Sequence, residues 1–498
     1  MESATAHRPP PPSPPPRNIA LLPPPGFLGH LIPFIELAKK MVLNHNCTVT
    51  LIIPNDGSSM EPQKSLLRHI PTSINPVFLP PAPAKDQCPP ENSNPETLLP
   101  TRVTRSIPAI RATLSSLREM GTPAAALVVD LFAPFAIDVA REFGIPAYIF
   151  YVIAANELSL AMDLPKLHEE EEQQHQESQI KLPGGIVLNS SDFPDSMKDR
   201  NSEDYKWALD LSNKYLEADG ILVNSFFGLE SEAFHVLEQG HPRTPPVYPV
   251  GPLIRTTTTS SSPSSDDDDD DHECLGWLNN QPPKSVLFVS FGSGGTLSTE
   301  QFRELAFGLE MCRHRFLWVL RTPQENTAAA YLNTNNKSAE VKDNPLEYLP
   351  KGFLERTKDR GFVVATWAPQ IRVLSHGSVG GFVTHCGWNS ILESSVFGVP
   401  MIAWPLCFEQ KMSAVFLRDG LRGAIRVKPN ELNGVVERDH FSEVVKQLMD
   451  EEGEPGTKIQ KRMTEVKIAA ADVMDQEHGS SALALSRLVH KWITINPK

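Results

Sequence analysis

The sequence alternates short apolar runs with amphipathic helical patterns, and it repeats this plan on both sides of one long polar stretch. In the first half, the runs typical of buried strands are residues 19–22, 49–53, 126–129, 147–150 and 221–223. In the second half, they are residues 286–291, 316–320, 362–364, 382–384 and 401–404. Strands that alternate with helices form parallel sheets covered by helices on both faces. The sequence therefore predicts an α/β fold with two such sheets.

Two local patterns place helices directly after strands. Apolar residues behind the first run recur at the spacing of one helix face, and they are Leu31, Phe34, Ile35, Ala38, Met41 and Val42. Ser298 and Gln301 have the spacing of a capping box, which marks the start of a helix behind the strand at 286–291.

The length and the polar stretches predict how the chain is divided. A chain of 498 residues is too long for one hydrophobic core, so two domains of about 200 residues each are expected. The run TTTTSSSPSSDDDDDD buries no apolar surface and predicts a disordered linker. Shorter polar insertions stand at residues 169–178 and 322–345. The predicted parts are a disordered proline-rich lead (1–17), an N-terminal Rossmann-like domain (18–255), the linker (256–272), a C-terminal Rossmann-like domain (273–475) and a C-terminal helix that packs back on the first domain (476–498).

Charge and cysteine usage exclude several classes of protein. The net charge is 46 − 60 = −14 without a concentrated basic stripe, so no nucleic acid partner is expected. The six cysteines are scattered without a CxxC pair, which is typical of free thiols in a reducing compartment. The proline-rich N-terminus is not a secretory signal, and no run of about 20 apolar residues is present to span a membrane. We expect a cytoplasmic monomer.

Residues 367–410, WAPQIRVLSHGSVGGFVTHCGWNSILESSVFGVPMIAWPLCFEQ, hold most of the candidate ligand-binding groups. Trp367 and Trp388 are candidate aromatic platforms, and Trp367 stands before a proline that fixes a helix start. His385 ends an apolar strand, and a helix start follows it. Such a junction aims backbone N–H groups and the positive end of the helix dipole at one point, which suits a diphosphate. A core tryptophan and a structural histidine are the alternatives.

Two pairs of polar residues close this stretch. Ser390 and Glu393 have the spacing of a capping box, which by itself explains both side chains. The functional alternative assigns Ser390 and Asn389 to phosphate and Glu393 to ribose hydroxyls. Glu409 and Gln410 follow the last apolar run, where a carboxylate and an amide can bind adjacent sugar hydroxyls. Two polar residues in a surface loop are the alternative.

A glycine-rich loop around Ser293, with the sequence FGSGG, follows one predicted strand and precedes a helix. The backbone N–H groups of such a loop can approach a phosphate closely. Together with residues 367–410, this loop predicts a site for a nucleotide diphosphate and its attached sugar.

Several segments resemble the plant family 1 inverting glycosyltransferases, most closely the hydroquinone (arbutin-type) and monolignol glucosyltransferase branch. Residues 367–410 resemble the UDP-sugar box of that family, and further matches are HLIPFIELAK, LVVDLF, DVAREFGIPAYIFY, YPVGPLIR, SVLFVSFGSGG and RFLWVLR. The resemblance implies a GT-B fold, UDP-glucose as donor, a small aromatic acceptor, and no metal or other cofactor. The donor-binding residues that it implies are Ser293, Trp367, Ala368, Gln370, His385, Trp388, Asn389, Ser390, Glu393, Glu409 and Gln410.

The catalytic base of that family is a histidine held by an aspartate, and the matching residues here are His30 and Asp130. A helix start disfavours the imidazolium at His30, and Asp130 ends a buried strand, where a carboxylate can orient the ring. The implied reaction is a direct displacement. His30 removes the proton of an acceptor hydroxyl, the oxygen attacks C1 of glucose, and UDP leaves to give a β-O-glucoside. Phenols, monolignols and flavonoids all fit as acceptors.

The chain departs from the family pattern at two places. The loop at residues 23–30 has one residue more between its glycines than the pattern P-x-P-G-x-G-H, and we expect a bulge that keeps His30 in register with its helix. A bulky Phe408 stands directly before Glu409, where relatives have a small residue. The candidate acceptor-binding residues are Phe27, Phe132, Tyr151 and Phe408.

Two other functions compete with this interpretation. A nicotinamide dehydrogenase needs GxGxxG after the first strand and an acid about 20 residues further on. Three prolines stand there instead, and Asp56 is a poor substitute for the acid. A non-catalytic UDP-sugar-binding protein would need a disabled base. His30 and Asp130 argue against it, whereas the extra loop residue leaves it open.

Overall fold

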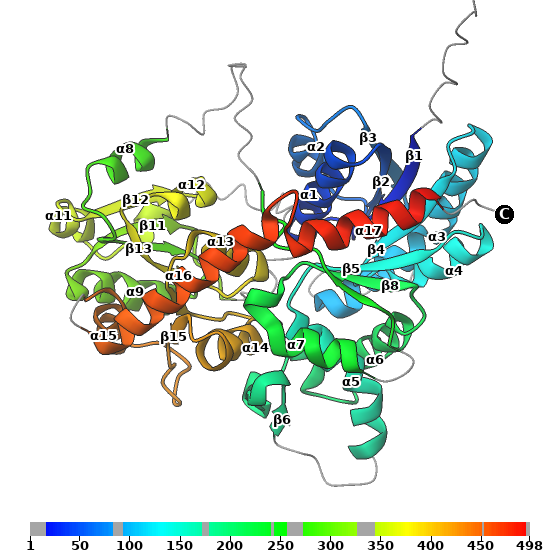
Figure 1. The fold of residues 1–498 in the computed structure, drawn as a ribbon. Coiled ribbons are helices and arrows are strands. Elements are labelled where there is room, and N and C mark those ends of the chain that lie inside the picture. The colour runs from blue at the N-terminus through cyan, green and yellow to red at the C-terminus, as the bar shows by residue number, and fades with distance from the viewer. Residues whose placement is uncertain are drawn as a thin grey trace, which may run out of the picture.

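The structure, a computed structural model, describes residues 16–82, 93–171, 179–240, 244–255, 272–325, 344–450 and 453–494. The predicted disordered lead and linker fall outside these ranges, apart from residues 16, 17 and 272 at their edges. Two α/β halves lie side by side, and the C-terminal helices run from one to the other (Figure 1).

The first half is built on a seven-stranded sheet with the order β3-β2-β1-β4-β5-β8-β9. Its strands are β1 (Arg17–Leu22), β2 (Cys47–Asn55), β3 (Ile74–Pro81), β4 (Ala124–Asp130), β5 (Ala147–Tyr151), β8 (Gly220–Val223) and β9 (Val247–Pro249). β1 pairs in parallel with both β2 and β4, so the order of the strands reverses between β1 and β4. In a Rossmann-like sheet this reversal opens a crevice at the carboxyl ends of the strands.

The second half repeats the arrangement with a six-stranded sheet of order β12-β11-β10-β13-β14-β15. Its strands are β10 (Val286–Ser290), β11 (Arg315–Leu320), β12 (Gly361–Ala365), β13 (Val379–Thr384), β14 (Met401–Ala403) and β15 (Ala424–Arg426). β10 pairs in parallel with β11 and β13, so the reversal here lies between β10 and β13. Each sheet lies within its own cluster of buried apolar side chains.

Helices cover both sheets, and β6 (Gln179–Lys181) forms a small antiparallel hairpin with β7 (Val187–Asn189). None of the helices in the described residues is long and apolar enough to cross a membrane. The helices are α1 (Leu28–Asn44), α2 (Glu61–Leu66), α3 (Pro95–Glu119), α4 (Ile137–Glu142), α5 (Ala155–Glu171), α6 (Glu203–Tyr215), α7 (Phe227–Gln239), α8 (Glu273–Asn279), α9 (Thr299–Cys312), α11 (Phe353–Thr357), α12 (Gln370–Ser375), α13 (Trp388–Phe397), α14 (Gln410–Val415), α15 (Arg438–Met449), α16 (Glu454–Met474) and α17 (Ser480–Thr494).

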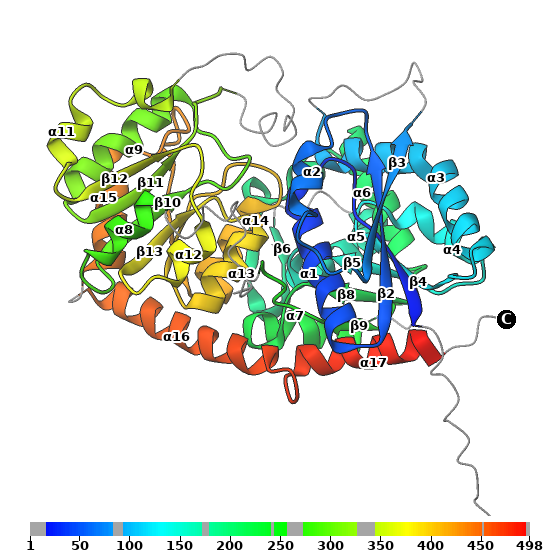
Figure 2. The same cartoon turned by 90° about the horizontal axis from the view of Figure 1, so that it is seen from above.

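The last two helices run along both halves. α16 packs on α13 and α15 of the second half, and α17 contacts β4 and β9 of the first (Figure 2). Trp492 of α17 is fully buried, and its ring lies 4.9 Å from that of Tyr148 in β5. The end of the chain therefore contributes to the core of the half where the chain begins.

The ten strands predicted from apolar runs are all present. The strands that sequence reasoning missed are β3, β9 and β15 at sheet edges, and the hairpin β6–β7. The predicted stripe of α1 is buried except for the half-buried Val42. Ser298 caps α9 by accepting the N–H of Gln301 at 3.2 Å, but the side chain of Gln301 bonds the backbone of Val436 instead of closing the box.

Candidate active site

His30 and Asp130 meet where the strand order of the first sheet reverses. Asp130 is the last residue of β4, and His30 lies in the first turn of α1, which follows β1. Nδ1 of His30 is 2.8 Å from Oδ2 of Asp130, whose Oδ1 accepts the backbone N–H of Phe132 at 2.9 Å. An ionised carboxylate only accepts hydrogen bonds, so the arrangement assigns the ring proton to Nδ1. The lone pair of Nε2 is then left to take up a proton.

Two phenylalanines enclose the imidazole of His30. Phe27 meets it edge-on with ring centroids 4.8 Å apart, and Phe132 stacks on it at 5.5 Å with the planes 10° apart. Two of the four candidate acceptor-binding residues therefore lie beside the histidine. The candidate Tyr151 is buried in the first core, where its ring packs edge-on against Tyr215 at 5.9 Å.

The extra residue of the loop at 23–30 does not separate His30 from Asp130. Gly26 has a φ of +71°, in the left-handed region that favours glycine, and a Cβ there would lie 2.6 Å from Oδ2 of Asp56. Asp56 pairs in turn with Arg102 of α3 at 2.8 Å. This turn lets α1 begin directly after Phe27, so His30 stays in the first helical turn. Sequence reasoning missed the ion pair, because no local pattern links its two residues.

Gln370, the first residue of α12, holds two side chains of α13. Its Nε2 donates to Oγ of Ser390 at 2.9 Å and to Oε2 of Glu393 at 2.7 Å. α13 begins at Trp388 with Gly387 as its N-cap, so the predicted capping box of Ser390 and Glu393 is wrong. A contact between two helices engages both side chains instead. Burial raises the pKa of Glu393 to about 7, against the hydrogen bond from Gln370, which lowers it.

His385 follows β13 and faces the glycine-rich loop after β10, where the strand order of the second sheet reverses. Burial lowers its pKa to about 4, so the ring is neutral at physiological pH. A Cβ on Gly292 would lie 2.5 Å from Cε1 of this ring, and a Cβ on Gly387 would lie 2.3 Å from Nε2. The two glycines are therefore needed for the ring to occupy this place.

The remaining donor candidates near this loop differ in exposure. Trp367 is 51% exposed, and its ring lies 6.0 Å from that of His272. An exposed indole has a face on which a nucleobase can stack. Ala368, the next residue, is buried, whereas Ser293 in the glycine-rich loop is exposed.

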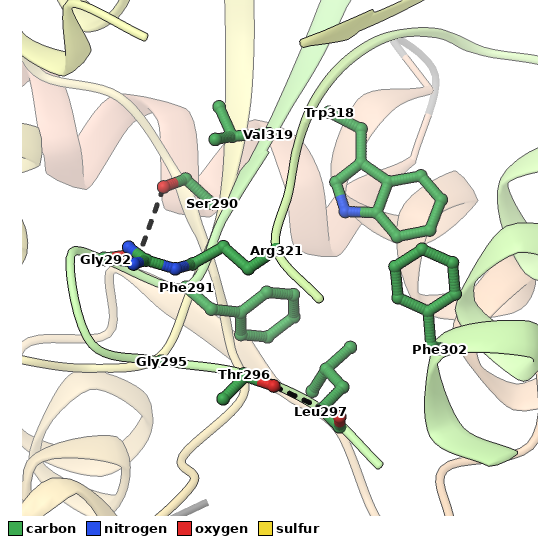
Figure 3. Close-up of a pocket in the computed structure, with 10 residues that line it drawn as sticks. All are labelled: Ser290, Phe291, Gly292, Gly295, Thr296, Leu297, Phe302, Trp318, Val319 and Arg321. Atoms are coloured by element: carbon green, nitrogen blue, oxygen red, sulfur yellow. Dashed lines mark hydrogen bonds between the residues drawn. The ribbon is translucent and has the colours of Figure 1, made fainter. Parts of the chain in front are cut away.

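The inner side of the glycine-rich loop is closed. Figure 3 shows the cavity there, with the side chain of Arg321 extended toward Gly292, whose carbonyl accepts a hydrogen bond from Nη1 at 3.2 Å. Phe302 and Trp318 form its far wall, and its volume is about 10 Å³. That is room for about one water molecule, so this cavity is too small to hold a nucleotide.

The end of residues 367–410 lies close to His30 of the first half. Oε1 of Gln410 accepts the N–H groups of Leu406 at 3.0 Å and Cys407 at 3.2 Å, so this side chain fixes the loop after β14. Burial raises the pKa of Glu409, while its own backbone at the helix start and its electrostatic interaction with His30 lower it. Glu409 is therefore within electrostatic reach of His30.

Three hydrogen bonds of the box cross to the first half. Trp388 is only 3% exposed and donates Nε1–H to a backbone carbonyl, so the prediction of a second aromatic platform is wrong. Phe408, also buried, has a φ of +57°. The bonds are Trp388 Nε1 to Asn224 O at 2.8 Å, Asn389 Nδ2 to Gly29 O at 2.7 Å, and Phe408 N to Asp195 Oδ2 at 2.8 Å.

Sequence reasoning also missed two carboxyl groups near Glu409. Burial raises the pKa of Glu96 in α3 to about 8, and it raises that of Glu157 in α5 well above its usual range. The negative charge of Glu409 shifts both in the same direction. With a pKa of about 8, Glu96 is protonated at neutral pH and can donate as well as accept hydrogen bonds. Each is a single acid in a helical segment, which no pattern distinguishes from a surface residue.

Among the described residues, no three His, Cys, Asp or Glu side chains form a group that could hold a metal ion. The groups that converge are instead a histidine–aspartate pair on one side of the domain interface and a set of hydrogen-bond donors around a helix start on the other.

Comparisons with known proteins place this arrangement in a class. The family described as "UDP-glucoronosyl and UDP-glucosyl transferase" matches residues 263–452. Hydroquinone glucosyltransferase of Rauvolfia serpentina is 47% identical over 95% of this chain and 97% of its own length. UDP-glycosyltransferase 72B1 of Arabidopsis thaliana is 46% identical, with 95% and 96% covered. Phytolacca americana UGT2, solved with UDP-2fluoro-glucose and pterostilbene, superimposes with a TM-score of 0.84 at 42% identity, over 96% of this chain and 100% of that chain.

The fold is therefore GT-B, and the site is that of an enzyme that transfers a sugar from a UDP-sugar. The chain belongs to plant family 1 of the UDP-glycosyltransferases, in the branch of the hydroquinone glucosyltransferases. The predicted fold, family and enzyme class are confirmed. The alternative of a non-catalytic binding protein finds no support among these relatives, which are named as transferases.

Proposed function

We propose that this enzyme transfers glucose from UDP-glucose to the phenolic hydroxyl of a small plant metabolite, with inversion, and that His30 is its catalytic base. The observation that carries the proposal is the 2.8 Å contact between Nδ1 of His30 and a fully buried Asp130, which leaves Nε2 to accept a proton. The relatives named as glucosyltransferases and the one solved with UDP-2fluoro-glucose support glucose as the sugar.

The reaction proceeds in one displacement. Nε2 of His30 takes the proton of the phenolic hydroxyl while the oxygen attacks C1 of glucose. The bond between C1 and the UDP oxygen breaks, and UDP departs with the electron pair. Attack from the face opposite UDP converts the α-linked donor into a β-O-glucoside. Asp130 accepts a hydrogen bond from the imidazolium and stabilises its charge.

The donor lies across the helix start of α13. Trp367 stacks on the uracil, and Glu393, held by Gln370 beside Ala368, binds the ribose hydroxyls. The diphosphate accepts hydrogen bonds from the residues around the N-terminus of α13 and from the glycine-rich loop. These donors balance the charge of the leaving UDP, so the proposed reaction uses no metal. The diphosphate-binding residues are Ser293, His385, Asn389 and Ser390, and Glu409 and Gln410 bind the glucose hydroxyls.

The acceptor lies against Phe27 and Phe132, which already form aromatic walls around the base. Flat phenols fit such walls, and the relatives include hydroquinone and anthocyanidin glucosyltransferases. Phe408 and Tyr151 are buried, so they shape this pocket from behind rather than through an open face. The protonated carboxyl of Glu96 can receive a second polar group of the acceptor.

We further propose that the enzyme is a cytoplasmic monomer. Both halves of the site come from one chain, so no second copy is required to complete it. The five described cysteines are free and buried, which fits a reducing compartment.

The test is a UDP-release assay with UDP-glucose and a panel of phenols, comparing the wild type with His30→Ala. Turnover that collapses in the variant while UDP still binds with unchanged affinity is the expected result. Full activity in His30→Ala would refute the assignment of His30 as the catalytic base. UDP binding without turnover on any phenol of the panel would refute phenolic glucosylation.

A further inference from the structure

Pro33 removes the regular partner of one carbonyl at the start of α1. In an α-helix each C=O accepts a hydrogen bond from the N–H four residues on. For Gly29 that residue is Pro33, which has no N–H and whose ring crowds the carbonyl four residues earlier. The carbonyl directly before His30 therefore lacks its regular helical donor, and a donor from outside the helix can take that place.

Asn389 of the other half supplies that donor. Its Nδ2 lies 2.7 Å from the oxygen of Gly29, although the two residues are 360 positions apart. Asn389 is the second residue of α13, and its neighbour Trp388 anchors the same helix start by donating to Asn224 at 2.8 Å. Because the indole fixes the helix start, the amide of Asn389 is held in place.

We propose that Asn389 is a positioning residue for the catalytic base. Its amide sets the first turn of α1, and hence His30, through the carbonyl that Pro33 leaves without a helical partner. This inference rests on the proposed roles of His30 and of the donor site. An asparagine amide has two N–H groups, so one binds Gly29 while the other is suited to a phosphate oxygen of the donor. The residue thus ties the position of the base to the helix that binds UDP.

The consequence for catalysis follows from geometry. A base must be aligned with the proton it removes, and a misplacement of about 1 Å can cost about 100-fold in rate. Loss of the Asn389 amide should therefore reduce kcat by a larger factor than it reduces the affinity for UDP. Replacement of Pro33 by alanine supplies an N–H that can bind Gly29 within the helix, so it should reduce the dependence of His30 on Asn389.

The experiment is a double-mutant cycle on the full chain with Asn389→Ala, Pro33→Ala and the double variant. It measures kcat for a phenol, the dissociation constant of UDP by calorimetry, and hydrogen–deuterium exchange of the peptide around residues 26–36 without ligand. Asn389→Ser replaces Asn389→Ala if the latter does not fold, because its short hydroxyl does not reach Gly29.

We expect Asn389→Ala to lower kcat about 100-fold and to speed exchange in the first turn of α1. In the Pro33→Ala background, the effect of Asn389→Ala on kcat should shrink at least about tenfold, while its effect on UDP affinity stays the same. Effects on kcat that simply multiply, or an exchange rate that Asn389→Ala leaves unchanged, would overturn the proposal. Hydrogen–deuterium exchange can be measured without turnover. A wild type that is inactive on every phenol would therefore reject the proposed function, while the exchange rates would still test the contact between Asn389 and Gly29.

Discussion

The two oxygens of Asp130 have different partners, which makes Asp130→Asn a specific test of the base. Oδ1 accepts the backbone N–H of Phe132, and Oδ2 accepts Nδ1–H of His30. Asparagine has one oxygen, and the N–H of Phe132 can only donate, so that oxygen turns toward Phe132. The amide N–H₂ then faces Nδ1 of His30, which becomes an acceptor. The ring proton moves to Nε2, and the base is lost without a change in shape.

We expect kcat to fall by roughly 10⁴-fold, the size of loss seen when the equivalent change imposes the wrong tautomer in a serine protease triad. This corresponds to about 5 kcal/mol of barrier, because each factor of ten is worth 1.36 kcal/mol. Asp130 is 0% exposed, so it touches no ligand, and the affinity for UDP should stay unchanged.

The assay is UDP release with hydroquinone and UDP-glucose, and the matched control is Asp138→Asn. Asp138 is an exposed acid of the same half, 54% exposed at its side chain and paired with Arg141, so its variant should keep the wild-type rate. A nitrophenol at alkaline pH is already ionised and needs no base, so the loss in Asp130→Asn should be much smaller with it. A fall of less than tenfold with hydroquinone, or the same fall with both acceptors, would refute the reasoning.

Three further predictions concern stability and the donor site. Because burial raises the pKa of Glu393 from 4.5 to about 7, the contribution of Glu393 to stability is fully present below the unfolded pKa and is lost as the pH rises through 7. Glu393→Gln should therefore raise the free energy of unfolding at pH above about 7 by up to about 3 kcal/mol, measured as a higher Tm, and leave Tm unchanged in acid. Gly387→Ala places a methyl group 2.3 Å from Nε2 of His385 and should lower the affinity for UDP, measured by calorimetry, at least about tenfold. Gly377→Ala is the control, because its Cβ would lie in open space and the affinity for UDP should not change. Trp492→Ala should lower the free energy of unfolding by about 3–5 kcal/mol in denaturant titration, and an unchanged midpoint would mean that α17 does not stabilise the first half.

The central strands could be predicted because a run such as 286–290 is apolar on both faces, and only a doubly covered sheet accommodates it. Three of the four strands at the edges of the two sheets, β3, β9 and β15, could not be predicted. β3 (Ile74–Pro81) contains prolines and many exposed side chains, because only one of its edges is paired. Its assignment depends on β2 lying beside it, which no local pattern specifies.

The helix start of α13 illustrates how tertiary contacts override a local motif. Ser390 and Glu393 have capping-box spacing, yet Gly387 is the N-cap and Gln370 binds both side chains. Trp388 looks like an aromatic platform in the sequence, but its indole is buried and donates to Asn224. Exposure and partner are properties of the assembled domains, so the sequence offered no means to separate these alternatives.

The sequence by itself determined the two Rossmann-like halves, the family and the enzyme class, because apolar periodicity and motif spacing are local and dense along the chain. Only the tertiary structure decided how the halves meet. The contact of Asn389 with Gly29 joins residues 360 positions apart, and it exists because Pro33 removes a hydrogen bond from one helix and α13 presents a donor from the other half. Such a bond depends on the relative position of two folded surfaces, which no stretch of sequence encodes alone.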